Sequence, residues 1–290
     1  MSKHPPPPAL SDAPLAPGLY VVATPIGNLR DITLRALDVL HGCDLLLAED
    51  TRVTGKLLAA YGLSKTMQRY DEHAAERARP KIMAALAAGQ RVALVSDAGT
   101  PLVSDPGYRL VLEVVAAGHT VIPIPGPSAA LAALTLAGLP TDRFLFAGFA
   151  PTKGGARRTF FSEFAAVQAT LIFFESGPRL RASLEDMAAV FGGDRMAAVT
   201  RELTKLYETA VRGPLADLAV DDRLDGPKGE IVVLVGPGEE KAATEGDADA
   251  ALAEALTRLP PGEAASEVAK ALGLNRRDLY RRALALKDVP

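Results

Sequence analysis

The sequence is poor in the residues that build disulfide or metal frameworks. Its 290 residues include one cysteine, Cys43, and four histidines. A single cysteine excludes an intramolecular disulfide framework and is typical of a reducing compartment. The histidines and Cys43 do not have the spacing of zinc ligands, so we expect no structural zinc and no metal in the functional site.

Excess charge and long hydrophobic segments are also missing. The 32 basic and 35 acidic side chains give a net charge of −3, so any contact with nucleic acid must come from a local basic patch. Residues 114–141 carry no charge, but Pro123, Pro125 and Pro127 divide them into pieces too short to cross a bilayer. Residues 1–18 hold six prolines and no apolar run of the signal-peptide type, which predicts a disordered tail. These absences indicate a cytoplasmic protein without a membrane partner.

Two common nucleotide-binding fingerprints are lacking. No G-x-G-x-x-G follows the first expected strand, which disfavours a nicotinamide or flavin dinucleotide. No G-x-x-x-x-G-K-[ST] occurs, which excludes a P-loop nucleotidase.

What the chain does contain, from residue 19 onward, is short Val, Leu and Ile runs alternating with helical stretches. We expect strands at residues 19–24, 44–48, 91–95 and 120–124, and helices at 31–40, 55–61 and 74–88. Continuous apolar runs indicate strands buried on both faces, as in a parallel sheet. Residues 19–127 are therefore predicted to form an α/β domain.

Further strand and helix patterns follow in the second half of the chain. The expected strands are residues 144–149, 169–174, 197–200, 208–212 and 230–235, and the expected helices are 128–136 and 179–191. They predict a second α/β domain over residues 128–236. Residues 237–249, rich in Ala, Gly, Glu and Asp, are interpreted as a linker.

The C-terminal segment, residues 250–290, has a different character. Residues 264–272 and 276–286 have amphipathic helical patterns, and Asn275 can cap the second helix. Their shared apolar face would comprise Val268, Leu272, Leu279, Ala283 and Leu286. From residue 262 onward, six basic side chains against four acidic ones give a balance of +2. This pattern fits a helix-turn-helix unit that touches nucleic acid, and it fits an ordinary helical hairpin equally well.

Three loops follow expected strands, at the sheet edge where open α/β folds bind ligands: residues 23–29, 96–107 and 123–129. In the second loop, glycines permit close approach of a ligand, and polar side chains such as Asp97 and Asp105 surround them. That loop can hold a molecule with amino, carboxyl and ribose groups, or it is a decorated turn. In the third loop, Ser128 begins a helix whose free N–H groups can bind a carboxylate, or the loop is a hinge. We expect these two loops to be adjacent and to share a ligand.

Six motifs make a more specific comparison possible: TPIGNLRDITLRAL, LLLAEDTR, VSDAGTPLVSDPG, PIPGPSAA, LIFFES and TRELTK. Their order resembles the tetrapyrrole-methylase-like fold of S-adenosylmethionine-dependent enzymes, and more narrowly the ribosomal RNA small subunit methyltransferase I branch. The resemblance covers residues 19–235 and the C-terminal helical pair. It implies two α/β domains of the tetrapyrrole-methylase type with a ligand cleft between them, plus a small helix-turn-helix-like unit.

The resemblance also implies an activity. It is the 2′-O-methylation of a cytidine ribose in small-subunit (16S) rRNA by a homodimer, with S-adenosylmethionine as methyl donor and without a metal. The substrate is either free 16S rRNA or the assembled small ribosomal subunit. Two alternatives stay open: a methyltransferase acting on a tetrapyrrole or another small molecule, and a non-catalytic nucleic-acid-binding protein that senses a ligand.

Carried over by position, the resemblance implies a donor-binding set drawn from all three loops and from the second domain. It comprises Pro25, Ile26, Asp97, Ala98, Gly99, Thr100, Val103, Ser128, Ala129, Phe174, Glu175, Leu203, Gly229 and Glu230. The candidate catalytic residues, which could assist departure of the hydroxyl proton, are Glu49, Asp50, Arg52 and Lys205. Glu49 and Asp50 also have a structural interpretation, as an ion pair with Arg52 or as a helix cap.

RNA contacts are expected from basic residues in two places. Lys153, Arg157 and Arg158 are interpreted as a flexible basic loop, and Arg276 and Arg277 begin the last helix. Arg179 is available for a phosphate. Where relatives of this branch often read E-S/A-x-H-R-L, this chain has Pro178 at the histidine position, so no role of that histidine is transferred.

Overall fold

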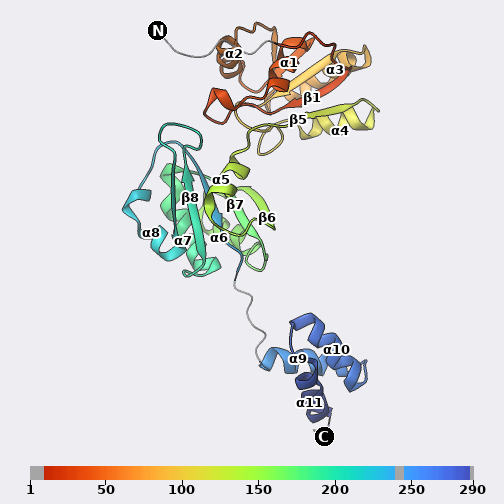
Figure 1. Cartoon of the computed structure of the whole chain (residues 1–290), viewed down its shortest axis with the longest axis vertical. Helices are drawn as coiled ribbons and strands as arrows, with labels where there is room; N and C mark the ends of the chain where they lie inside the picture. Colours follow the sequence, from red (N-terminus) through yellow and green to blue (C-terminus); the bar gives the residue numbers. More distant parts are fainter. Residues whose placement is uncertain (1–9, 239–244, 288–290) are drawn as a thin grey trace. The chain divides into compact units, whose positions relative to one another are not determined.

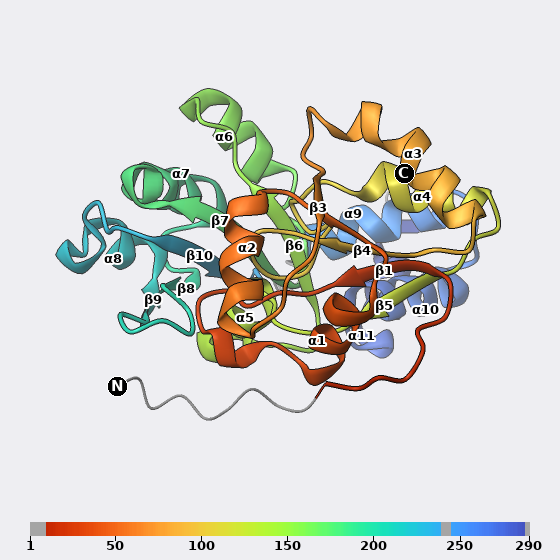
Figure 2. The same ribbon diagram turned by 90° about the horizontal axis from the view of Figure 1, so that it is seen from above.

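The computed structural model describes residues 10–238 and 245–287. The chain divides into two compact units, Met1–Gly238 and Glu239–Pro290, and each is described by itself. Figures 1 and 2 show the ribbon in two orientations.

Half of the segment predicted as a disordered tail, residues 1–9 of 1–18, lies outside the described residues. Residues 10–17 contact the first core at a few points. The backbone N–H of Ser11 donates to Asp38 Oδ1 at 2.8 Å, and the Tyr20 hydroxyl donates to the Ala16 carbonyl at 2.7 Å. Leu15 packs against the core beside them.

The first sheet contains five parallel strands in the order β3-β2-β4-β1-β5. The strands are β1 (Gly18–Val22), β2 (Leu45–Ala48), β3 (Met67–Arg69), β4 (Arg91–Val95) and β5 (Val121–Ile124). The helices of this half are α1 (Leu34–Gly42), α2 (Thr51–Ala60), α3 (Ala75–Ala87) and α4 (Tyr108–Ala116), preceded by a short 3-10 turn, Leu29–Asp31. The predicted parallel arrangement is confirmed, while β3 and α4 were not anticipated.

Both faces of this sheet are covered. Tyr20 and Val22 point into a core shared with α1 and α2. Leu19 and Val21 alternate with them and point into a second core, shared with α3 and α4. Because every side chain of β1 is buried, the strand has no polar face, which explains its continuous apolar sequence.

The second sheet has the order β6-β7-β10-β8-β9 and mixes strand directions. Its strands are β6 (Phe144–Phe149), β7 (Thr170–Ser176), β8 (Met196–Arg201), β9 (Thr209–Pro214) and β10 (Glu230–Val235). Only β6 and β7 pair in parallel, and the other neighbours are antiparallel.

Helices cover both faces of the second sheet as well. The helix α5 (Ala129–Ala137) packs on one face. On the other lie α6 (Gly154–Ser162), α7 (Leu180–Phe191) and α8 (Leu215–Val220). Figure 2 shows α6 and α7 next to each other. Short 3-10 turns, Gly177–Arg179 and Asp222–Leu224, complete the elements. The predicted α/β class therefore holds for both halves.

The second unit consists of α9 (Glu245–Leu256), α10 (Pro261–Leu272) and α11 (Arg276–Lys287). Its core contains Val268, Leu279 and Ala283, with Leu272 and Leu286 partly buried against it, as the amphipathic pattern predicted. The Asn275 side chain accepts a hydrogen bond from the Arg277 N–H at 2.9 Å, so the predicted cap is confirmed.

Two boundary predictions need correction. The segment predicted as a linker, residues 237–249, already contains the start of α9 at Glu245, because its Ala and Glu residues also favour helix. The segment 153–158 is not a flexible loop, because α6 begins at Gly154 and includes Arg157 and Arg158. The sequence did not predict this helix because two adjacent glycines, which disfavour helix, stand at its start.

Candidate active site

The three loops predicted to bind a ligand are fastened to one another at the carboxyl ends of β1, β4 and β5. Thr24 and Gly99 exchange two backbone hydrogen bonds of 2.8 and 3.0 Å, which pair the first loop with the second. The Thr100 hydroxyl donates to the Pro127 carbonyl at 3.2 Å, which joins the second loop to the third. The expected adjacency of the second and third loops is thus confirmed.

Gly99 is required at the centre of this arrangement. Its φ of +80° lies in the left-handed region, and a Cβ there would lie 3.4 Å from Ile26 Cγ2 and 3.8 Å from the Pro127 oxygen. All three loops therefore meet at a position where the backbone conformation, rather than a lack of space, disfavours a side chain.

A cavity of about 420 Å³ opens beside these loops. Its wall is drawn from loops of the first sheet and from the facing ends of strands of the second. From the first half come Ile26, Glu49 and residues 97–100 and 103–105; from the second come 128–129, Phe149, 174–176 and 229–232.

Most of the residues that the resemblance assigned to the donor lie in this wall, brought together from five separate segments of the chain. The exceptions are Pro25 and Leu203, which do not line it. Leu203 is buried in the same apolar core as Ile26. The wall also includes residues outside the assigned set: Ser104, Asp105, Phe149, Ser176, Ile231 and Val232.

Three carboxylates gather on the first-sheet side of the cavity. Glu49 Oε2 accepts a hydrogen bond from the Asp97 N–H at 3.3 Å, and Asp97 Oδ1 accepts one from the Asp50 N–H at 2.9 Å. Burial raises the pKa of Glu49, and the neighbouring Asp97 carboxylate raises it further. Burial also raises the pKa of Asp105 to about 6, with additional contributions from Glu49 and Asp97. The cavity thus has a negative wall that favours a cationic ligand.

The opposite electrostatic character is found where α5 begins. Ser128 and Ala129 line the cavity at this helix terminus, and no side chain caps it. The N–H groups of the first turn of a helix have no partner within the helix and favour an anion. A ligand that carries a cation and a carboxylate at opposite ends therefore matches this cavity.

Asp50 and Arg52, two of the candidate catalytic residues, are engaged with each other outside the cavity wall. The Asp50 side chain caps α2 by accepting from the Arg52 N–H at 2.8 Å, and it pairs with the guanidinium at 2.5 Å. The hydrogen bonds from Arg52 hold the pKa of Asp50 well below its usual range. The Arg52 side chain is 86% exposed. The structural interpretation of Asp50, as cap and ion pair, is the one that the geometry bears out.

Lys205 lies at the back of the site between two carboxylates. Its Nζ donates to Glu202 Oε1 at 2.8 Å and to Glu230 Oε2 at 2.9 Å, and its stem covers Gly27 in the first loop. Burial lowers the pKa of Lys205, but the hydrogen bonds to Glu202 and Glu230 outweigh it, so the pKa is raised. A protonated Lys205 can hold these loops together, and its raised pKa disfavours a role as a base.

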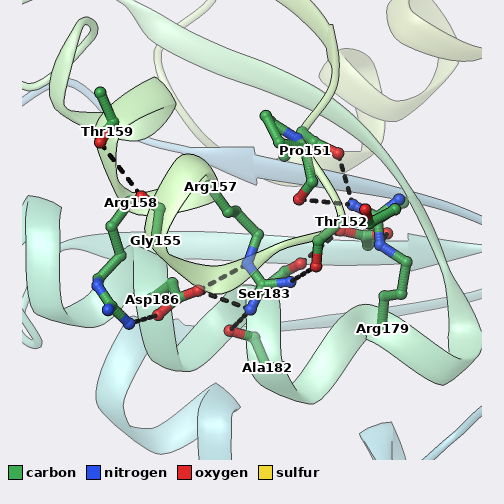
Figure 3. A network of polar contacts seen from close by, with 12 residues as sticks. Pro151, Thr152, Gly155, Arg157, Arg158, Thr159, Arg179, Ala182, Ser183 and Asp186 are labelled. Atoms are coloured by element: carbon green, nitrogen blue, oxygen red, sulfur yellow. Dashed lines mark hydrogen bonds and ion pairs between the residues drawn. The ribbon is translucent and has the colours of Figure 1, made fainter.

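Two of the basic residues assigned to RNA, Arg157 and Arg179, are bound within the protein, as Figure 3 shows. Arg157 is 6% exposed, and its Nε donates to Asp186 Oδ2 at 2.7 Å. Arg179 donates from Nη2 to the Ala150 carbonyl at 2.5 Å and lies 3.3 Å from the Glu175 carboxylate. The prediction that Arg157 contacts RNA is therefore not supported, because Asp186 of α7 withdraws it from the surface.

Lys153 and Arg158 remain at the surface beside this network. Arg158 shares Asp186 through a 2.9 Å ion pair but keeps 56% of its side chain exposed. In the second unit, Arg276 and Arg277 line an open concavity of about 620 Å³ together with Tyr280. These four basic residues are placed so that a phosphate could reach them.

Comparison with known proteins identifies the fold. Residues 18–219 match the model of the tetrapyrrole (corrin/porphyrin) methylases. The solved structure of the methyltransferase CobJ superposes with a TM-score of 0.58 at 20% identity, covering 79% of this chain and 96% of that one. The α/β unit is thus a tetrapyrrole methylase fold.

The sequence comparisons narrow the family further. Residues 242–287 match the RsmI C-terminal HTH domain. The chain is 56% identical over 276 residues to the Ribosomal RNA small subunit methyltransferase I of Mesorhizobium japonicum, covering 95% of this chain and 94% of that protein. It is 45% identical to the protein of the same name from Escherichia coli O157:H7, covering 92% and 94%. The chain belongs to the ribosomal RNA small subunit methyltransferase I family of methyltransferases, as the ordered motifs predicted.

Proposed function

We propose that this protein transfers the methyl group of S-adenosylmethionine to the 2′-oxygen of a cytidine ribose in small-subunit (16S) rRNA. The observation that carries the proposal is the single cavity formed by loops from both sheets, with carboxylates on one side and an uncapped helix terminus on the other. The names of the relatives support small-subunit ribosomal RNA as the substrate.

The residues of the cavity fit the methyl donor. The carboxylates of Glu49, Asp97 and Asp105 suit a molecule that carries a sulfonium and an ammonium group. The N–H groups at the start of α5 suit its carboxylate. Apolar side chains such as Ile26, Phe174 and Val232 offer a surface for the adenine ring.

When bound, S-adenosylmethionine supplies a methyl group that is already activated for displacement. The protein then contributes alignment, because holding the acceptor oxygen in line with that methyl group removes much of the entropic barrier. The loops joined around Gly99 and the hydrogen bonds of Lys205 to Glu202 and Glu230 are suited to hold the two substrates in this alignment.

The proton of the 2′-hydroxyl must pass to a base as the new carbon–oxygen bond forms. Glu49, a candidate from the sequence, lines the cavity, and the structure adds Asp105 as a second candidate beside it. With a pKa of about 6, Asp105 is mostly ionised at neutral pH and is a stronger base than an ordinary carboxylate. Asp50 and Arg52 would act indirectly, since their pair caps the helix that follows Glu49.

RNA would be held by basic residues at the surface, namely Lys153, Arg158, Arg276 and Arg277, with strong dependence on salt. We further propose, from the family resemblance, that the active form is a homodimer working in the cytoplasm. Within the described residues, no helix combines the length and the apolar character needed to span a membrane.

The test is transfer of labelled methyl from S-adenosylmethionine to purified small subunits and, in parallel, to free 16S rRNA. Digestion to nucleosides and mass spectrometry should find one 2′-O-methylcytidine. The Gly99→Val variant serves as a control, because a branched side chain at a φ of +80° should prevent donor binding.

Three results would contradict the proposal. Methyl transfer to a porphyrinoid but not to RNA would indicate a tetrapyrrole methyltransferase. Donor binding without any transfer would indicate a ligand sensor. A methylated base in place of the ribose would leave the substrate class correct and the chemistry wrong.

A further inference from the structure

Phe149 is an exposed aromatic residue at the cavity that no step of the proposed reaction uses. It is the last residue of β6, the edge strand of the second sheet, and it lines the cavity although 56% of the residue is exposed. A large ring left in water beside a binding cavity is a candidate contact for a ligand.

A β-bulge directs Phe149 to the cavity. The pairing of β6 with β7 slips between Phe146 and Gly148, so that Phe149 pairs with Phe174. Without the extra residue, alternation would place Phe149 on the face of Leu145 and Ala147, which pack under α6 and α7. With it, Phe149 lies on the same face as Phe146 and Phe174.

Gly148 is the residue that permits the bulge. Its φ is +71°, which a side chain rarely tolerates. A Cβ at this position would lie 3.5 Å from the Ser104 hydroxyl oxygen in the second loop. The bulge therefore sits against the other lip of the cavity, where Val103 is also exposed.

Phe174 contacts the Phe149 ring, and two arginines hold the backbone that follows it. Its edge-to-face contact with Phe174 has a centroid distance of 5.4 Å and an interplanar angle of 66°. The carbonyls that follow it are held by arginines: Ala150 and Pro151 accept from Arg179, and Thr152 accepts from Arg157 at 3.5 Å (Figure 3). A ring fixed before a ligand arrives loses little entropy on binding.

The surroundings favour a nucleobase. Lys153 and the half-exposed Arg158 follow Phe149 within nine residues, outside the cavity wall, where they can meet phosphates. Small ligands are mostly enclosed by their pockets, and the buried Ile26, Ile231 and Val232 offer such a surface to the donor. Unpaired RNA bases, in contrast, stack on exposed aromatic side chains.

We propose that the exposed face of Phe149 is the stacking platform for the base of the acceptor nucleotide, with Lys153 and Arg158 contacting the flanking phosphates. This inference rests on the proposed function and adds the acceptor side of the site to it. Arg157 and Arg179 act as positioning residues that hold the backbone behind the ring.

The test compares Phe149→Leu and Phe149→Tyr with the wild-type protein. Phe144→Leu is the matched control, because Phe144 begins the same strand, is 46% exposed and does not line the cavity. We expect Phe149→Leu to raise KM for small-subunit rRNA roughly tenfold, the loss of one base stack. Phe149→Tyr and Phe144→Leu should resemble the wild type, and calorimetry should find the donor Kd unchanged in all three.

Two results would refute the stacking role of Phe149. Equal KM values for wild type and Phe149→Leu would show that the ring contacts no acceptor, and a weakened donor Kd in that variant would assign the ring to the donor. RNA binding separates this inference from the proposed function. If the wild type methylates no RNA, the proposed function fails. The affinity of both proteins for a single-stranded oligoribonucleotide then still tests whether Phe149 stacks on a base. Weaker binding by Phe149→Leu supports the stacking role, and equal binding refutes it.

Discussion

Replacing Asp105 by asparagine should stabilise the protein, and only at pH values where the aspartate is charged. Asp105 lies in the cavity wall, and burial raises the pKa of its carboxyl from 3.8 to about 6. The Glu49 and Asp97 carboxylates contribute in the same direction, while a hydrogen bond from Ser96 opposes them. Each unit of pKa shift corresponds to about 1.4 kcal/mol. Because solvent still reaches this partly buried carboxyl and screens it, the charged form costs the folded protein about 1–2 kcal/mol.

The sign of the pH dependence follows from proton binding. Between pH 3.8 and about 6 the folded protein keeps the Asp105 proton while the unfolded chain has lost it. Stability therefore falls as pH rises through this window, and the full cost is present above about pH 6. Asparagine does not ionise, so the variant escapes the cost.

Urea denaturation followed by circular dichroism at several pH values measures the difference. We expect Asp105→Asn to match the wild type near pH 4 and to exceed its free energy of unfolding by about 1–2 kcal/mol near neutral pH. If Asp105 takes the hydroxyl proton, kcat of the same variant should fall even though its stability rises. A stability difference that does not change with pH would refute the reasoning.

Asp44→Asn is the matched control with the opposite sign. Hydrogen bonds from the Arg91 guanidinium lower the pKa of Asp44 to about 2, and 31% of its side chain is exposed. Its contribution to stability is present above pH 3.8 and is lost as pH falls through about 2. Near neutral pH the variant should be less stable by roughly 1 kcal/mol, the size expected of a partly exposed pair.

Three further predictions concern the cavity, the arginine network and the second unit. Gly99→Val should weaken donor binding at least tenfold by calorimetry, because the side chain approaches Ile26 from a φ of +80°; an unchanged Kd would remove the second loop from the site. Arg157→Ala should lower the free energy of unfolding by about 3 kcal/mol, because Arg157 is buried. Arg158→Ala should lower it by less than about 1 kcal/mol, because Arg158 is exposed although it pairs with the same Asp186. Equal effects in urea denaturation would contradict this difference in burial. Removing residues 239–290 should raise KM for rRNA and leave the donor Kd unchanged, and undiminished methylation would make that unit merely structural.

The sequence predicted the features that depend on local pattern. Continuous apolar runs such as that of β1 correctly indicated strands covered by helices on both faces. The continuous apolar sequence of β10 did not reveal that this strand pairs antiparallel with its neighbours. Burial on both faces produces such a sequence whatever the direction of the neighbouring strands. The cap at Asn275 was predictable because it involves residues close in the chain.

The fate of the charged residues depended on contacts between distant segments. Arg157 and Arg158 are neighbours on α6 and both pair with Asp186, and nothing in their sequence indicates that the first is buried and the second faces water. Likewise, the raised pKa of Asp105 requires burial and the approach of Glu49 from another loop. Electrostatic energies depend on distance and solvent exposure, which a sequence does not contain.

By itself, then, the sequence determined the fold class, the family and the loops that carry the site, because periodicity, turn residues and ordered motifs are properties of neighbouring residues. The tertiary structure alone decided which side chains of those loops reach the cavity. Phe149 illustrates the reason: one extra residue in β6, accommodated by Gly148, moves its ring from the face covered by α6 and α7 to the face that borders the cavity. Such a shift of register exists only between paired strands.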